Sequence, residues 1–354
     1  MPAAERNRRP TVVRLSDLSS IVVAVEHMIG FRPTESLVAV ALCGPRERMT
    51  FSLRLDLPAS DADPSITEAV AGEVATRMVN ARADAVLLFV HSAEAPVDGR
   101  LPRRRLVDSV AAALGAPLAD AALVAGDRLW SYLCADMRCC PPEGRLIDRQ
   151  SPDAVALAAE HAALGNVVLD SRDELVASVQ PVGGIAAVSM RQAQTRATDE
   201  MLDVGLLAFS DAMQGEIDRL AECFVDPRAS LSDDEAARVA VALGDKLLRD
   251  ALLVRLSQVD DGLLRLMTAV ARRTQPPHDA AVCTLVGYAH YLDGSGVVAA
   301  AAFERALRSE PDYVMAQYLA TMLQHQVPPE EVRKCGTGCA SEVARLSRSR
   351  RRRR

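Results

Sequence analysis

The stretch LVAVALCGPRERMTFSLRLDL, residues 37–57, decides the fold class of this 354-residue chain. Its first part, LVAVALC, is almost wholly apolar, which predicts a strand that is buried on both faces of a sheet. Its last part, TFSLRLDL at residues 50–57, alternates, with one phenylalanine and three leucines on one face and polar residues on the other. The GPRER link between the two parts suits a hairpin. The sequence therefore predicts two neighbouring strands here.

Strand and helix patterns alternate through the rest of the first half. Helices are expected at residues 18–29, 65–81, 104–114, 154–163 and 173–179, with Ser65 as an N-cap and Gly30 as a C-terminal stop. AVLLFV at residues 85–90 has the composition of a central strand, and residues 122–124 can pair with 129–133 across a Gly-Asp turn. The order predicts an α/β domain with a mixed sheet over residues 11–183, after a disordered N-terminus at residues 1–10.

Helical periodicity dominates the second half. It predicts an all-α domain over residues 192–333. The clearest helix start is Ser232-Asp233-Asp234-Glu235, a capping box in which serine and glutamate each satisfy the other's backbone amide. Apolar residues recur behind it at helical spacing, at Val239, Leu243, Leu247 and Ala251.

Residues 283–311 carry the offsets of one tetratricopeptide repeat. The matching positions are Gly287, Gly294, Ala299, Phe303, Ala306 and Pro311. That motif places small residues where two antiparallel helices touch and a proline after the second helix. The functional interpretation is a peptide-binding groove, and the alternative is a helical hairpin that serves as scaffold. The second domain is therefore expected to be tetratricopeptide-repeat-like.

Charge and hydropathy limit the partners. The net charge of −6 offers no overall attraction to nucleic acid or to an anionic membrane. Residues 340–354 are expected to form a disordered, arginine-rich tail, and the weak candidates for phosphate contacts are Arg350, Arg351, Arg352, Arg353 and Arg354. No secretory signal and no run of ~20 apolar residues is visible. We expect a soluble cytoplasmic protein without a membrane partner, in which thiols stay reduced.

The segment WSYLCADMRCCPPEG, residues 130–144, holds three of the eight cysteines. Zinc prefers four ligands in pairs at short spacing, and Cys134, Cys139 and Cys140 supply only three. The fourth would come from elsewhere, with Cys335 or Cys339 of the CGTGC segment as candidates. A redox centre that pairs Cys134 with Cys139 or Cys140 is a second interpretation, and free thiols in a stiff loop are a third.

Other catalytic patterns are weak. His91 ends a predicted central strand and Asp98 follows in the loop, a place where open α/β sheets bind ligands. A lone histidine there is more often a surface residue than a general base. The sequence lacks a Walker-type loop, a His-Glu-x-x-His pattern and a Gly-x-Ser-x-Gly elbow.

Two stretches resemble a known family. GFRPTESLVAVAL (residues 30–42) and WSYLCADMRCCPPEG are similar to signatures of the actinobacterial domain-of-unknown-function family 4192. The resemblance covers most of the chain and implies no activity or cofactor. It implies that two loops belong to one family pattern, which favours a shared site. Its residues are Gly30, Phe31, Pro33, Trp130, Cys134, Asp136, Cys139, Cys140 and Glu143.

Three functional hypotheses follow. The first is a non-catalytic interaction or regulatory module whose helical domain binds another protein. The second is a redox or metal-binding enzyme that uses the Cys134, Cys139 and Cys140 loop, with zinc as the metal. The third is nucleic-acid binding through the arginine-rich tail, for which the net charge is unfavourable.

Overall fold

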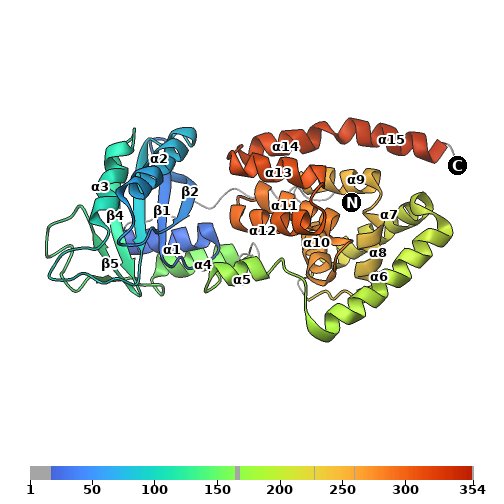
Figure 1. Ribbon diagram of the computed structural model, residues 1–354, viewed down its shortest axis with the longest axis horizontal. Coiled ribbons are helices and arrows are strands. Elements are labelled where there is room, and N and C mark those ends of the chain that lie inside the picture. The colour runs from blue at the N-terminus through green and yellow to red at the C-terminus, as the bar shows by residue number, and fades with distance from the viewer. Residues whose placement is uncertain (1–16, 164–167, 227, 259, 353–354) are drawn as a thin grey trace. The chain divides into compact units, whose positions relative to one another are not determined.

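The computed structural model describes residues 17–163, 168–226, 228–258 and 260–352 (Figure 1). The chain divides into two compact units, Met1–Arg172 and Asp173–Arg354. The division falls earlier than residue 183, where the sequence pattern placed the end of the first domain. The reason is that Val179 is buried in the core of the second unit, and its carbonyl oxygen accepts a 2.7 Å hydrogen bond from Arg305 there. The N-terminal residues 1–10, expected to be disordered, lie outside the described residues.

The first unit is built on a six-stranded mixed sheet with the order β2-β1-β3-β4-β5-β6. The strands are β1 (Ser36–Cys43), β2 (Arg48–Asp56), β3 (Ala85–His91), β4 (Leu118–Ala125), β5 (Arg128–Ser131) and β6 (Arg145–Leu146). Only the β3–β4 pair is parallel among these strands. The predicted hairpin of β1 and β2 is confirmed, and so is the pairing of β4 with β5 across the Gly126-Asp127 turn.

Helices cover both faces of this sheet (Figure 1). Helices α1 (Leu18–Ile29) and α4 (Pro152–Ala163) pack on one face, and α2 (Pro64–Asn80) and α3 (Arg104–Ala113) on the other. Strand β1 sends alternate residues into the two cores, which explains its continuous apolar run.

Capping residues set where the helices begin and end. Gly30 ends α1 with φ 87°, as predicted. The N-cap of α2 is Asp63 rather than the predicted Ser65, because Pro64 occupies the first helical position and the Asp63 carboxylate accepts the Ser65 amide at 2.8 Å.

The second unit is helical and has one apolar core. Its helices are α5 (Arg172–Ala177, which begins at the last residue of the first unit), α6 (Gly184–Val204), α7 (Leu206–Cys223), α8 (Asp233–Ala242), α9 (Lys246–Leu256), α10 (Asp261–Arg273), α11 (Asp279–Leu292), α12 (Gly296–Ser309), α13 (Val314–Gln324), α14 (Pro329–Gly338) and α15 (Ala340–Arg352). The Ser232–Glu235 capping box is confirmed at the start of α8. The apolar period behind it crosses a break between α8 and α9, where Asp245 caps the second helix. None of the described helices is long and apolar enough to cross a membrane.

Helices α11 and α12 form the hairpin that the repeat-like offsets predict. Gly287 of α11 lies directly against the Phe303 ring of α12, and a Cβ atom at this glycine would stand 2.4 Å from Phe303 Cε1. Helix α12 ends at Ser309, two residues before Pro311. A small residue therefore does occupy the contact between these two helices.

The arginine-rich segment that the sequence predicts to be disordered is largely helical. Residues 340–352 form α15, which packs against α9. Arg350 holds this helix in place, because it pairs with Asp211 at 3.3 Å and with Asp245 at 2.5 Å and donates to the Leu207 carbonyl oxygen at 2.7 Å. Two acidic side chains balance the arginine charge, which the tail sequence alone does not reveal.

Candidate functional site

The loop between β5 and β6 brings three thiols together. The Ser131 hydroxyl oxygen accepts the amides of Leu133 and Cys134 at 3.1 Å each. The Asp136 carbonyl oxygen then accepts the amides of Cys139 and Cys140 at 3.0 and 2.7 Å. As a result, the Sγ atoms of Cys134, Cys139 and Cys140 lie within 4.8 Å of one another. Among the described residues this is the only group of three or more potential metal ligands that converge so closely.

Trp130 and Gly144 close the same loop. The Trp130 indole N–H donates to the Pro142 carbonyl oxygen at 2.9 Å. Gly144 has φ +77° and lies so close to the ring that a Cβ atom would stand 2.4 Å from Trp130 Cε2. Arg128 also donates to the carbonyl oxygens of Glu143 and Gly144, at 3.1 and 2.9 Å. The tryptophan and the terminal glycine of the motif are therefore structural, and they hold the thiol loop against the sheet edge.

The Cys134 and Cys140 thiols differ in acidity. Hydrogen bonding from the Asp136 amide, and next from the Cys140 thiol, lowers the pKa of Cys134. Burial, helped by the proximity of Cys134, raises the pKa of Cys140 to about 12. Cys134 is therefore the better thiolate of the two.

The predicted acidic residues, Asp136 and Glu143, shape the thiol loop but do not join the sulfur group. The Asp136 carboxylate accepts the Arg138 amide at 2.9 Å, and its carbonyl oxygen orders the two following cysteines. Glu143 contacts Arg128 through its carbonyl oxygen. Neither carboxylate belongs to the group of three sulfurs.

Gly30, Phe31 and Pro33 lie elsewhere in the unit. Phe31 is buried, and its neighbours pair with Leu169: the Arg32 amide donates to the Leu169 carbonyl oxygen, and the Leu169 amide to that of Gly30, at 3.0 Å each. This segment leads into β1, whereas the thiol loop leaves β5, and β3 and β4 lie between these strands. Three strand spacings amount to ~14 Å. The structure therefore does not bring the two family signatures into one site.

His91 belongs to a buried polar group at the end of β3. It is only 3% exposed, and its cross-strand partner in β1 is Ser36, whose hydroxyl accepts a 2.8 Å hydrogen bond from Arg54. Burial, and then the charges of Arg149 and Arg54, lower the pKa of His91 to about 4. Arg149 itself pairs with buried Glu26 of α1 at 2.6 Å. A histidine shut off from solvent in this way suits a structural role better than that of a general base.

The Glu26–Arg149 pair could not be predicted from the sequence. The two residues are 123 positions apart, and neither stands in a recognisable motif. The only sequence signal was a charged residue inside the apolar stretch of α1.

Asp98, the residue that the sequence pairs with His91 as a candidate, lies in the loop after β3 with φ 49°.

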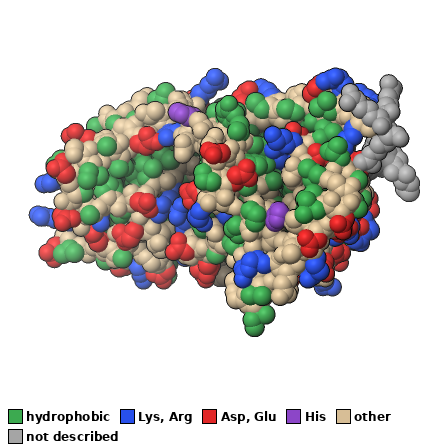
Figure 2. All heavy atoms as spheres, turned by 45° about the vertical axis from the view of Figure 1, so that its right-hand side comes forward, with side chains coloured by type: hydrophobic (Ala, Val, Ile, Leu, Met, Phe, Trp, Pro, Cys, Tyr) green, Lys and Arg blue, Asp and Glu red, His purple; other side chains and the backbone are tan. Residues whose placement is uncertain are grey.

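The other candidates lie in the second unit. Cys335 and Cys339 are exposed, and Gly336 between them packs so tightly that a Cβ atom would stand 2.0 Å from the Tyr288 hydroxyl. Close helix packing therefore accounts for the glycine in CGTGC. Arg350 is already paired with an acidic side chain. The structure does not describe the side chains of Arg351 and Arg352, nor any part of Arg353 and Arg354. On the face that Figure 2 shows, acidic and basic side chains are interspersed.

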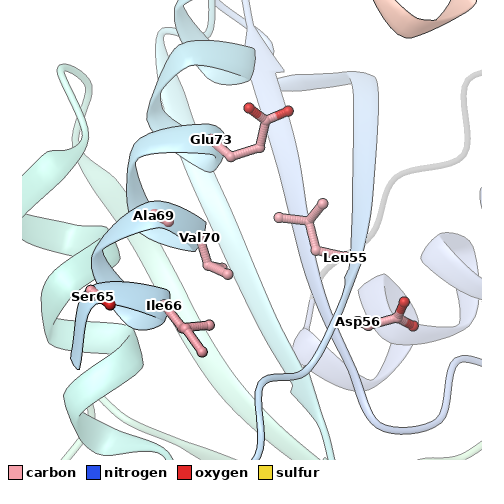
Figure 3. Close-up of a pocket in the computed structure, with 7 residues that line it drawn as sticks. All are labelled: Leu55, Asp56, Ser65, Ile66, Ala69, Val70 and Glu73. Carbon is pink, nitrogen blue, oxygen red and sulfur yellow. The ribbon is translucent and has the colours of Figure 1, made fainter. Parts of the chain in front are cut away.

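A shallow hollow of about 500 Å³ lies between α2 and β2 (Figure 3). Its lining is Leu55, Asp56, Ser65, Ile66, Ala69, Val70 and Glu73. The two carboxylates pair with arginines, Asp56 with Arg54 and Glu73 with Arg77. None of the predicted site residues lines it, so the thiol loop remains the candidate site.

Comparison with known proteins agrees with the resemblance. No curated protein and no solved structure matches the chain. A family model described as "Domain of unknown function (DUF4192)" matches residues 19–330, which includes both signature stretches and extends from the second residue of α1 past the end of α13. The chain therefore belongs to the DUF4192 family.

Proposed function

We propose that the first unit binds a soft metal ion through Cys134, Cys139 and Cys140. The observation that carries this function is the convergence of the three Sγ atoms within 4.8 Å. Sulfur ligands of a tetrahedral zinc ion, at Zn–S bonds of ~2.3 Å, stand ~3.8 Å from one another. The three Sγ atoms, within 4.8 Å of one another, already lie near that spacing. Thiolate sulfur is also the ligand type that soft ions select.

The surrounding loop supports this proposal. Hydrogen bonds to Ser131 and Asp136 and the Trp130–Pro142 contact hold the backbone in place independently of any ion. Binding therefore costs little ordering of the chain, which favours affinity. The cysteines lie at the surface of the unit, where an ion can reach them from solution.

The test is the metal stoichiometry of the purified, reduced full chain. We expect one Zn²⁺ per chain, and Co²⁺ in its place with the intense sulfur-to-cobalt absorption of thiolate ligands. A chain with Cys134→Ser, Cys139→Ser and Cys140→Ser should bind neither ion. The matched control, Cys335→Ser with Cys339→Ser, should bind both as the natural chain does. Equal binding by the triple variant would refute the proposal.

We propose second that the helical unit engages a protein partner, through a tetratricopeptide-like arrangement that continues from α11 and α12 into α13. The specific observation is an apolar pair on α13: Val314 is 59% and Tyr318 67% exposed. The two residues are four positions apart, so they share one face of the helix. An exposed apolar stripe of this kind suits a partner surface.

The second proposal is tested with a double variant, Val314→Ser with Tyr318→Ser, in an affinity capture from the native cytoplasm. Partners retained by the natural chain should be lost by the variant. Ile185→Ser on α6, which removes a side chain that is 89% exposed, is the matched control. Retention of every partner by the double variant would contradict the role of α13.

A cytoplasmic location is part of the same proposal. All eight cysteines are free, including the three that converge. Thiols so close together persist in a reducing compartment and oxidise outside it. Fractionation of cells that express the full chain, followed by thiol labelling, tests this location.

A further inference from the structure

We propose that the three-sulfur site is selective for a thiophilic ion of coordination number three, with trivalent arsenic, taken up as arsenous acid, as its ligand in preference to Zn²⁺. This inference rests on the proposed function, and it names the ligand class of the same site. The argument starts from the number of ligands that the chain offers.

The described residues of the first unit bring three sulfur atoms together and no fourth cysteine, histidine or carboxylate within the same distance. Zinc in proteins takes four ligands, so here it would need a water molecule or another molecule to complete its coordination. Trivalent arsenic forms three bonds, and a lone pair occupies its fourth direction. Three converging thiols therefore satisfy arsenic completely and zinc incompletely.

The net charge of the complex also favours trivalent arsenic over zinc. Three thiolates around Zn²⁺ leave one net negative charge on the site, which requires compensation from neighbouring groups. Three sulfurs around trivalent arsenic form a neutral product. The same loop and the adjoining strand expose the hydrophobic side chains of Leu133, Met137 and Leu146 to solvent. A neutral complex is compatible with such a loop without any paired cation.

The binding step is a ligand exchange. Each of the three thiol sulfurs forms a bond to arsenic as one arsenic–oxygen bond breaks. The proton of each thiol leaves with the departing hydroxyl group as water, so that As(OH)₃ and three thiols yield As(SR)₃ and three waters. No atom changes its oxidation state, and no co-reactant is needed.

The loop geometry allows this exchange in the folded chain. Cys139 and Cys140 are adjacent, and the Asp136 carbonyl oxygen anchors both of their amides while Ser131 anchors that of Cys134. The three thiols therefore sit on one short, ordered segment. Cys139 is exposed, which leaves the site accessible from solution.

The experiment measures arsenite binding to the reduced full chain by loss of titratable thiols. It uses a background of Cys335→Ser with Cys339→Ser, because those two exposed cysteines lie four positions apart on α14 and its cap and form a rival dithiol. We expect one arsenic per chain and the loss of three thiols. Each of Cys134→Ser, Cys139→Ser and Cys140→Ser should then lower arsenite affinity by about 100-fold, since one arm of a chelate is removed. Circular dichroism of each variant verifies that it is folded.

The same samples separate the two proposals. Competition between the two ions on these samples tests the preference: zinc binding at these cysteines that is tighter than arsenite binding, or that occurs without arsenite binding, would overturn this inference and leave the soft-metal function standing. Loss of only two thiols, with one of the three single variants unaffected, would also overturn it. Binding of neither ion would overturn both. If arsenite binds the natural chain but not the background lacking Cys335 and Cys339, the site lies on α14 and the inference fails.

Discussion

Arg305 and Asp279 form an ion pair at 3.1 Å in the core of the helical unit, where their side chains are only 3% and 2% exposed. The same guanidinium donates to the carbonyl oxygens of Val179, Ala271 and Thr274, at 2.7, 2.7 and 2.5 Å. One arginine of α12 thus joins α11, the end of α10 and the segment before α6. Nearly all of its hydrogen-bonding capacity is used inside the protein.

Replacing Arg305 is expected to destabilise the helical unit strongly. Arg305→Leu leaves the Asp279 carboxylate buried without its counter-charge, which typically costs about 3–5 kcal/mol. The free energy of unfolding in urea, followed by circular dichroism, measures this loss. Arg345→Leu removes an arginine from an exposed pair with Glu342 and is the matched control, with little change expected. Equal stabilities of the two variants would contradict the buried role of Arg305.

Gly144→Ala is expected to open the thiol loop. The new Cβ atom would meet the Trp130 ring at 2.4 Å, and φ +77° is strained for any residue with a side chain. Trp130 fluorescence should change, and metal binding by the three cysteines should weaken. The control is Gly126→Ala in the β4–β5 turn, where φ is +61° but no atom lies within 4 Å of the added carbon. It carries the backbone strain of about 1–2 kcal/mol without the clash, so a loop that stays intact in both variants would refute the role of Gly144.

Gly287→Ala is expected to separate α11 from α12, because the added carbon would stand 2.4 Å from the Phe303 ring. Overpacking of this kind costs about 1–3 kcal/mol in a core. Gly215→Ala is the natural comparison, since Gly215 is an exposed position inside α7 with open space around it. That variant should gain about 0.5–1 kcal/mol from helix propensity. Urea unfolding of both chains should give opposite signs, and the same sign would contradict the close contact.

Acid is expected to destabilise the first unit through His91. Its pKa is about 4 in the fold and 6.5 in the unfolded chain, so the unfolded chain binds more protons between these values. The contribution of His91 is complete above pH 6.5 and is lost as the pH falls toward 4, with about 2 kcal/mol lost between pH 7 and pH 5. Urea unfolding followed by the single tryptophan, Trp130, measures this loss in the unit that contains both residues. His91→Gln should flatten the pH dependence by that amount, and an unchanged slope would contradict the assignment.

The positions of many elements could be predicted from the sequence. The helix over residues 18–29, its end at Gly30, the β1–β2 hairpin and the Ser232–Glu235 capping box are all confirmed. Each depends on a few neighbouring residues, whose periodicity or capping chemistry acts locally. Where two local signals competed, as at Asp63 and Ser65, the proline between them decided the helix start.

The candidate site divides in the same way. The sequence by itself determined which thiols were candidates, because Cys134, Cys139 and Cys140 stand on one short segment. Only the tertiary structure decided that their sulfurs converge, that the Gly30 loop lies apart from them, and that Arg350 and Arg305 are already paired. Local patterns follow from the geometry of the backbone, whereas these distances follow from how strands order in a sheet and how helices pack. Contacts such as Arg305 with Val179, 126 positions apart, exist only once the cores have formed.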